Sequence, residues 1–283
     1  MRRLIIDSGA TKTEYLLVTG EEILFRFKNR GININYVEDD EVFAILSECW
    51  KLLPQEEMPE EIVFYGAGCG KNFNSQRISV ILHHLFPNRC IHVYSDLMGA
   101  CHALCGKKSG WVAILGTGSS SCMYDGEKIV SIAPSLGYLL GDEGSGVHLG
   151  KLLLTSYLEG ELPDKLRQQL EAQYQLSVPI VMEQLYRKPF PNRFMSSLAP
   201  FMIENIDNQH ILSLSEHSFH AFLTKQLHYL LPDFQPSELN ISGSIAFYFQ
   251  AVIKNVAKKL EISVTKTVPA PIERLVGYYN NIR

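Results

Sequence analysis

Two short segments of the sequence combine glycine with hydroxyl side chains in a way that suits phosphate binding. Residues 7–13 read Asp-Ser-Gly-Ala-Thr-Lys-Thr, and residues 116–121 read Gly-Thr-Gly-Ser-Ser-Ser. Each segment lies between two stretches with the pattern of β-strands, so each is expected to form a tight turn. Backbone N–H groups and short hydroxyls in such a turn can surround phosphate oxygens. A plain hairpin explains one such turn, but two on matching strands predict a polyphosphate site.

Four carboxylates accompany these turns. Asp7 ends the first strand and could hold Mg²⁺ through water, because hard cations prefer oxygen ligands. Asp96 follows strand 91–94 at a helix start, where it either caps the helix or accepts the proton of a substrate hydroxyl in phosphoryl transfer. We expect the helix N-terminus to keep Asp96 ionised. Asp142 and Glu143 stand among four glycines, where they either bind sugar hydroxyls or form an acidic first helical turn.

The order of the predicted elements repeats itself. The first third of the chain reads β-β-β-α-β-α-β-α. After a linker at 106–110 a second meander of strands begins, and helices dominate from residue 141, with single helices expected over 194–206 and 246–260. This repetition predicts two related α/β domains that face each other across a cleft.

Composition and motifs exclude several classes of protein. The net charge of −4 does not suit a nucleic-acid surface, and no apolar run is long enough to span a bilayer. Asp7 interrupts the apolar stretch near the N-terminus, so no signal peptide is expected and the protein is predicted to be cytoplasmic. Residues 66–72 are not a P-loop, because Tyr65 and Asn72 occupy positions that require glycine and Ser or Thr.

Five segments, taken in order, resemble the actin-like ATPase superfamily, which includes sugar kinases, Hsp70 and actin. Within it the chain is most similar to N-acetylglucosamine kinases and the BadF/BadG/BcrA/BcrD ATPase family. The residues that carry this resemblance are Ser95–Ala100, Gly116–Ser119 and Gly141–Ser145. The resemblance implies two RNase H-like domains with a central nucleotide cleft. We expect the first at 1–106 plus a C-terminal helix at about 268–283, and the second, with a helical insertion, at 107–267.

The resemblance also implies roles for individual residues. Asp96 resembles the catalytic base, which would also contact the sugar. The expected phosphate-binding residues are Gly9, Thr11, Lys12 and Thr13 in the first loop and Gly116, Thr117, Gly118 and Ser119 in the second. The expected sugar ligands are Asp142, Glu143 and either Asn33 or Asn35. Gly243 matches the adenosine turn, although an ordinary strand-to-helix turn explains it equally well.

The sequence therefore predicts an ATP- and Mg²⁺-dependent kinase that phosphorylates the primary hydroxyl of an amino sugar such as N-acetylglucosamine. Its expected partner is the small sugar, a homodimer is left open, and neither nucleic acid nor a membrane is expected. One alternative is a BadF-type ATPase that activates a dehydratase or reductase through an iron–sulfur cluster, for which Cys101 and Cys105 are the close pair. Another is a non-catalytic sugar sensor, which we expect less because the chain starts at the first strand.

Overall fold

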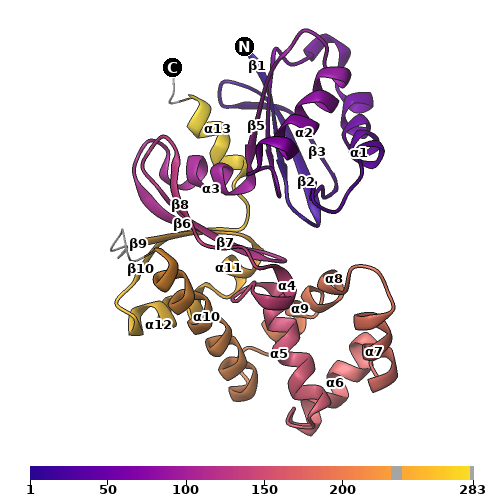
Figure 1. The fold of residues 1–283 in the computed structure, drawn as a ribbon, viewed down its shortest axis with the longest axis vertical. Coiled ribbons are helices and arrows are strands. Elements are labelled where there is room, and N and C mark those ends of the chain that lie inside the picture. The colour runs from indigo at the N-terminus through magenta and orange to yellow at the C-terminus, as the bar shows by residue number, and fades with distance from the viewer. Residues whose placement is uncertain (231–237, 281–283) are drawn as a thin grey trace. The chain divides into compact units, whose positions relative to one another are not determined.

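Figure 1 shows the computed structural model of the chain, which describes residues 1–230 and 238–280. The chain forms two compact units. The first contains residues 1–109, residues 124–129 and the C-terminal segment from Ala270, and the second contains residues 110–123 and 130–269. The domain boundaries expected from the sequence stay a prediction, and residues 281–283 of the expected C-terminal helix lie outside the described part.

The first unit is built on a five-stranded sheet with the order β3-β2-β1-β4-β5. Its strands are β1 (Arg2–Ser8), β2 (Lys12–Thr19), β3 (Glu22–Arg30), β4 (Glu61–Gly66) and β5 (Cys90–Ser95). The first three strands form an antiparallel meander, whereas β4 and β5 run parallel to β1. The parallel strands therefore end at the same edge of the sheet.

Side chains alternate between the two faces of this sheet along each strand, and each face is covered by different helices. Leu4 and Ile6 belong to the core beneath helices α1 (Asp39–Leu52) and α2 (Asn72–Leu85). Ile5 points the other way and packs with residues of the C-terminal helix α13 (Ile272–Asn280), because successive side chains of a strand leave opposite faces. Helix α3 (Asp96–Cys105) lies beside α13 on that second face, as Figure 1 shows. A short 3₁₀ helix, η1 (Gln55–Glu57), precedes β4.

The second unit repeats this topology. Its sheet has the order β10-β9-β6-β7-β8, which places a three-strand meander beside two later strands, as in the first unit. The strands are β6 (Gly110–Leu115), β7 (Ser119–Tyr124), β8 (Ile129–Ile132), β9 (Glu238–Ser242) and β10 (Ser263–Val268). Strand β9 pairs in parallel with β6 and with β10. The prediction of a duplicated α/β fold is confirmed.

Helices contribute most of the core of the second unit. They are α4 (Gly137–Leu140), α5 (Gly146–Leu158), α6 (Asp164–Tyr174), α7 (Val178–Tyr186), α8 (Pro191–Ser196), α9 (Ala199–Glu204), α10 (Gln209–Leu230), α11 (Ser244–Tyr248) and α12 (Gln250–Lys259). The sequence did not predict α4.

Two predicted single helices are each broken in the structure. The stretch 194–206 contains parts of α8 and all of α9, and Pro200 lies at the start of α9, where its missing N–H removes no helical hydrogen bond. The stretch 246–260 breaks between α11 and α12 at Phe249, whose backbone is not helical and whose side chain is buried. Both predictions of one continuous helix were therefore wrong.

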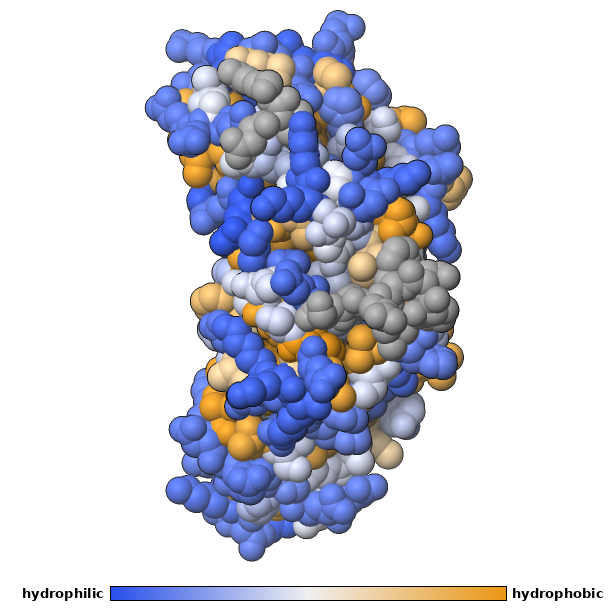
Figure 2. Space-filling model, turned by 90° about the vertical axis from the view of Figure 1, so that its left-hand side faces the viewer, coloured by the Kyte–Doolittle hydropathy of each residue, from blue (hydrophilic) through white to orange (hydrophobic). Residues whose placement is uncertain are grey.

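Within the described residues, no helix is both long and apolar enough to cross a membrane. The face shown in Figure 2 is largely hydrophilic, with apolar side chains in small patches between charged ones.

Candidate active site

The first unit brings predicted site residues to one edge of its sheet, together with the turn 66–70, which the sequence did not assign to the site. We call this set the first site group: Asp7, the loop 9–13, residues 33–35, the turn 66–70 and Asp96. Asp7 lies opposite Tyr65 in the β1–β4 register, and Gly66 lies opposite Ser95 in the β4–β5 register. Since these three strands are parallel, the residues that follow them meet at the edge where the strands end. The fold therefore places Asp7 and Asp96 near each other.

The first phosphate loop is a tight turn held from two sides. The Gly9 N–H donates to the Lys12 carbonyl at 3.0 Å. On the other side the loop packs on Gly31, where an added Cβ would lie 2.4 Å from the Gly9 oxygen. A side chain at position 31 would therefore push the loop away, a requirement that the local sequence did not reveal.

The side chains of this loop differ in their surroundings. Thr11 and Lys12 are exposed, and Lys12 pairs with Glu14 at 3.3 Å. The Thr13 side chain is buried, where its hydroxyl donates to the Arg30 carbonyl at 3.0 Å and lies 2.7 Å from the hydroxyl of Ser8. The Thr13 hydroxyl therefore fixes the shape of the loop, and a contact of Thr13 with phosphate stays a prediction.

Burial makes both carboxyls of the first site group weaker acids than usual. Burial, and next the charge of Asp96, raise the pKa of Asp7 to about 7. Burial also raises the pKa of Asp96, against the hydrogen bond that its carboxylate accepts from the Leu97 N–H at 2.9 Å. Desolvation therefore outweighs the hydrogen bonds at the helix start, which lower the pKa of Asp96, and the expectation that Asp96 is ionised stays a prediction. A carboxylate of this kind is a better proton acceptor.

Asp96 also has the predicted position at a helix start. It is the first residue of α3, and the Ser95 hydroxyl before it accepts the Met98 N–H at 3.1 Å. Ser95 therefore caps the helix, and the Asp96 carboxylate lies close enough to Asp7 and Cys69 for its charge to raise the pKa of both.

Both predicted sugar asparagines converge on the turn that resembled a P-loop. An added Cβ at Gly68 would lie 2.7 Å from the Asn35 amide nitrogen and 3.1 Å from the Asn33 carbonyl oxygen. The Asn33 oxygen accepts the Asn35 N–H at 3.1 Å, and the Asn35 oxygen accepts from the Asn74 amide at 2.8 Å. Sequence reasoning missed Asn74, which is buried and holds this arrangement together.

The turn 66–70 joins these asparagines to the predicted base. Beyond Gly68, an added Cβ at Gly70 would lie 4.0 Å from the Cβ of Ser95. The buried Cys69 lies between, and burial together with the charge of Asp96 raises the pKa of its thiol to about 12. One glycine-rich turn thus links the asparagine loop with the start of α3.

In the second unit the other predicted residues form a second site group, which comprises residues 116–119, residues 142–146 and Gly243. The Gly146 and Val147 N–H groups, at the start of α5, donate to the Gly116 and Thr117 carbonyls at 2.8 and 3.1 Å. The second phosphate loop and the Gly-Asp-Glu-Gly-Ser segment are therefore one hydrogen-bonded unit.

The Asp142 carboxylate lies against the second phosphate loop. It accepts the Ser119 N–H at 3.3 Å, and an added Cβ at Gly118 would lie 3.1 Å from its oxygen. Asp142 has a φ of 60°, in the left-handed region that is unusual for a residue other than glycine. Burial, and next the charge of Glu143, raise its pKa, while the Ser119 N–H and Lys151 lower it. Asp142 supports the loop in this structure, and its contact with sugar stays a prediction.

Glu143 has a partner that sequence reasoning missed. Its carboxylate forms an ion pair with Lys225 of α10. Burial raises the pKa of Glu143, but the hydrogen bond and charge of Lys225 outweigh burial, so that the net shift is downward. Ser119, Asp142, Glu143 and Lys225 line one small pocket of the second unit. This pocket is a polar surface on which a ligand could be bound.

Gly243 is placed where only glycine fits. Its φ is 121°, and an added Cβ would lie 2.1 Å from the carbonyl oxygen of Leu115. Leu115 immediately precedes the second phosphate loop, so the predicted adenosine turn packs directly beside that loop. The structure brings together all predicted residues of the second unit, and separately those of the first.

No family model and no curated protein matches the chain. A crystal structure of a candidate N-acetylglucosamine kinase from Porphyromonas gingivalis superposes with a TM-score of 0.88 and 35% identity over 98% of each chain. The chain belongs to the sugar kinases of the actin-like ATPase superfamily.

More distant members of the superfamily share the fold alone. A candidate N-acetylglucosamine kinase from Chromobacterium violaceum is 15% identical over 98% of each chain, with a TM-score of 0.74. A ROK glucokinase from Streptomyces griseus, solved with glucose and AMPPNP, is 14% identical over 98% of each chain, with a TM-score of 0.60. The architecture of this sugar kinase family thus covers nearly the whole chain.

Proposed function

We propose that this sugar kinase transfers the γ-phosphoryl group of ATP to the primary hydroxyl of N-acetylglucosamine or a close amino sugar. The observation that carries the proposal is the first site group, in which the turn 66–70 links two asparagines to the helix start that bears a desolvated carboxylate. The similar protein from Porphyromonas gingivalis, named for N-acetylglucosamine, supports the choice of substrate.

The chemistry assigns the central role to Asp96. Its carboxylate accepts the proton of the sugar hydroxyl as that oxygen attacks phosphorus, and the raised pKa favours this transfer. Asn33 and Asn35 offer amide and carbonyl groups that suit the hydroxyl and acetamido groups of an amino sugar. The hydrogen bond from the Asn35 N–H to Asn33, and that from the Asn74 amide to Asn35, hold both side chains ready for the substrate, which reduces the entropy lost on binding.

The second site group suits the nucleotide. The loop 116–119 offers backbone N–H groups and hydroxyls for phosphate oxygens, and the turn at Gly243, which packs beside Leu115 at the start of that loop, would hold the adenosine. In the first unit, Thr11 and Lys12 lie on the exposed side of their loop, where they can contact phosphate.

The carboxyls of Asp7 and Asp96 fit a magnesium ion. Asp7 carries an upward pKa shift to which Asp96 contributes, and a bound cation would relieve the repulsion between two desolvated carboxylates. Asp7 would hold Mg²⁺ directly or through water, and Mg²⁺ would neutralise charge on the transferred phosphoryl group. The loops would bind and orient the substrates, and Asp96 would accept the proton of the sugar hydroxyl.

The iron–sulfur alternative finds no support in the cysteines. Cys101 is fully buried and Cys105 is half-buried on α3, whereas a cluster shared between subunits needs exposed thiolates. The cytoplasmic location stays a prediction of the sequence.

The proposal is tested by ADP release from Mg·ATP against a panel of sugars that includes N-acetylglucosamine, N-acetylmannosamine, glucosamine and glucose. We expect release that depends on an N-acetylated amino sugar, with phosphate on the primary hydroxyl of the product by NMR. ADP release that is independent of every sugar would contradict the proposal. Sugar binding by calorimetry without any ADP release would instead indicate a sensor.

A further inference from the structure

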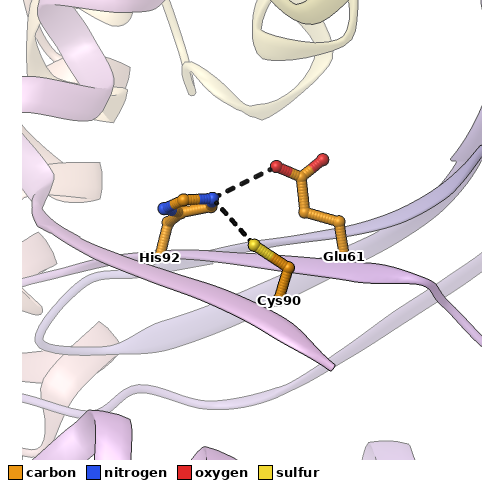
Figure 3. Close-up of side chains that lie close together, drawn as sticks. All are labelled: Glu61, Cys90 and His92. Atoms are coloured by element: carbon orange, nitrogen blue, oxygen red, sulfur yellow. Dashed lines mark hydrogen bonds and ion pairs between the residues drawn. The ribbon is translucent and has the colours of Figure 1, made fainter. Parts of the chain in front are cut away.

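Three side chains of the first unit form a cluster that the proposed kinase chemistry does not use. Figure 3 shows Cys90 and His92 of strand β5 and Glu61 of the neighbouring strand β4, with the His92 ring facing the other two side chains. From these residues we propose that the cluster is a binding site for a zinc-like divalent cation, held by one sulfur, one nitrogen and one oxygen.

The distances from the His92 nitrogen to the other two ligand atoms match tetrahedral coordination. The His92 Nε2 lies 3.3 Å from the Cys90 Sγ and 3.4 Å from the Glu61 Oε1, and all three atoms lie within 4.8 Å of one another. Zinc bonds of about 2.0 to 2.3 Å at tetrahedral angles separate neighbouring ligand atoms by roughly 3.3 to 3.7 Å. A cation can therefore enter between these atoms with little movement of the side chains.

The strands hold the three ligands on one face of the sheet. Cys90 and His92 are two residues apart, so their side chains leave β5 on the same face. Glu61 lies opposite Cys90 in the parallel β4–β5 register. Because β5 is an edge strand, and because Cys90 and His92 are exposed or nearly so, solvent cations can reach the site.

The Glu61 carboxylate is oriented by a partner on its far side. The Arg3 guanidinium donates to Glu61 Oε2 at 2.6 Å, which leaves Oε1 toward His92. Arg3 itself lies over the Tyr279 ring, 4.1 Å from the centroid. Such outer contacts fix the direction of a metal ligand and raise affinity.

The chemistry of the donors selects the metal. A thiolate and an imidazole favour zinc over magnesium or calcium, which prefer oxygen ligands. Three protein ligands leave one tetrahedral position, which water would fill. Binding releases the thiol proton to solvent, and it involves no change of oxidation state.

The site is separate from the first site group. Cys90 and Glu61 begin their strands, whereas Ser95 and Gly66 end them, so the two sites lie about 16 Å apart along β5 at 3.3 Å per residue. A bound cation would cross-link edge strand β5 to β4 and would cover the exposed Cys90 thiol. We therefore assign it a stabilising role.

Cobalt(II) provides a direct test, because a thiolate ligand gives it an intense charge-transfer band that carboxylate and water ligands do not. The titration uses the full chain without nucleotide or Mg²⁺, under argon with a non-thiol reductant. We expect one equivalent of Co²⁺ to produce the band, and Zn²⁺ to abolish it by displacement. In Cys90→Ser the band should disappear, and in His92→Gln the affinity should fall at least tenfold, within the range seen for lost ligand support.

Matched substitutions outside the cluster make the test specific. Cys105→Ser and His84→Gln change the same residue types at other positions and should leave the titration unchanged. Zn²⁺ should also raise the thermal midpoint of the wild type but not that of Cys90→Ser. The proposal is overturned if the wild type shows no thiolate band with Co²⁺, or if Cys90→Ser keeps the band.

Discussion

At the scale of single residues, the proposed function assigns the role of proton acceptor to Asp96. Asp96→Asn preserves the size and the hydrogen bond from the Leu97 N–H but removes the proton acceptor. We expect kcat to fall by about 10²- to 10⁴-fold, the usual contribution of a general base, with little change in thermal midpoint. Steady-state kinetics with the preferred sugar checks this. Asp164→Asn, at an exposed surface position, is the control, and an unchanged kcat in Asp96→Asn would remove Asp96 from the role of base.

Asp7 should make the protein less stable as pH rises in the absence of divalent cations. Its pKa in the folded protein is about 7, above its ordinary value of 3.8. Between these two values the folded state binds more protons than the unfolded state, so the contribution of Asp7 to stability is lost as pH rises and stays lost above pH 7.

Asp7→Asn removes this effect. At pH 8 without Mg²⁺ we expect the free energy of unfolding to rise by about 1 to 2 kcal/mol, a discounted share of the shift because the folded protein can relax. At pH 4 the gain should nearly vanish. Urea unfolding at both pH values is the measurement, and an equal effect at both would show that the charge of Asp7 is not the cause.

At the scale of elements, the start of α5 and the second phosphate loop act as one piece. Asp142 is expected by family resemblance to bind sugar, yet here its carboxylate accepts the Ser119 N–H. Asp142→Ala should therefore raise KM for ATP by about tenfold, the value of one charge-assisted hydrogen bond. It should change KM for the sugar much less. Initial rates with each substrate varied in turn separate the two roles, since a larger rise in KM for sugar would support the predicted contact of Asp142 with sugar.

The turn between β9 and α11 depends on a glycine. Gly243→Ala places a methyl group 2.1 Å from the Leu115 oxygen at a φ of 121°, so we expect a loss of about 2 to 4 kcal/mol in stability and a weaker second phosphate loop. Gly277→Ala is a matched control in helix α13, where an added Cβ meets nothing within 4 Å. There alanine should stabilise by up to about 1 kcal/mol. Chemical unfolding of both variants decides whether the close approach, rather than the loss of glycine, is responsible.

At the scale of the whole molecule, helix α13 packs into the same compact unit as residues 1–109. Leu275 of α13 is fully buried in a core with Ile5 and Val63, and the Tyr279 hydroxyl lies 2.6 Å from that of Tyr65. Leu275→Ala should lower the stability of the first unit by about 3 kcal/mol, as for other buried leucines.

Thermal unfolding of the variant tests whether α13 stabilises the first unit. Leu158→Ala, at a partly exposed position of α5, should have a much smaller effect. If Leu275→Ala unfolds no earlier than Leu158→Ala, α13 does not support the first unit.

Local patterns in the sequence determined most element types, the repeated order of strands, both glycine-rich turns and the carboxylate at the start of α3. These features are readable because each depends on neighbours a few residues away: a strand needs alternation, a turn needs glycine, and Ser95 caps the helix it precedes. The two predictions of a continuous helix were wrong because a new helix begins beside Pro200, and because the buried Phe249 interrupts the other helix, although the apolar periodicity continues through both points.

Only the tertiary structure decided how the site is supported. Asn74 meets Asn35 across 39 residues of sequence, and Lys225 meets Glu143 across 82. Neither pair has a local signal, because sheet order and helix packing bring such residues together. The same holds for the need for glycine at positions 31 and 243, where the clash comes from a distant backbone. The cluster of Glu61, Cys90 and His92, proposed as a cation site, depends likewise on the register of two parallel strands. The pKa of about 7 at Asp7 depends on burial and on the charge of Asp96.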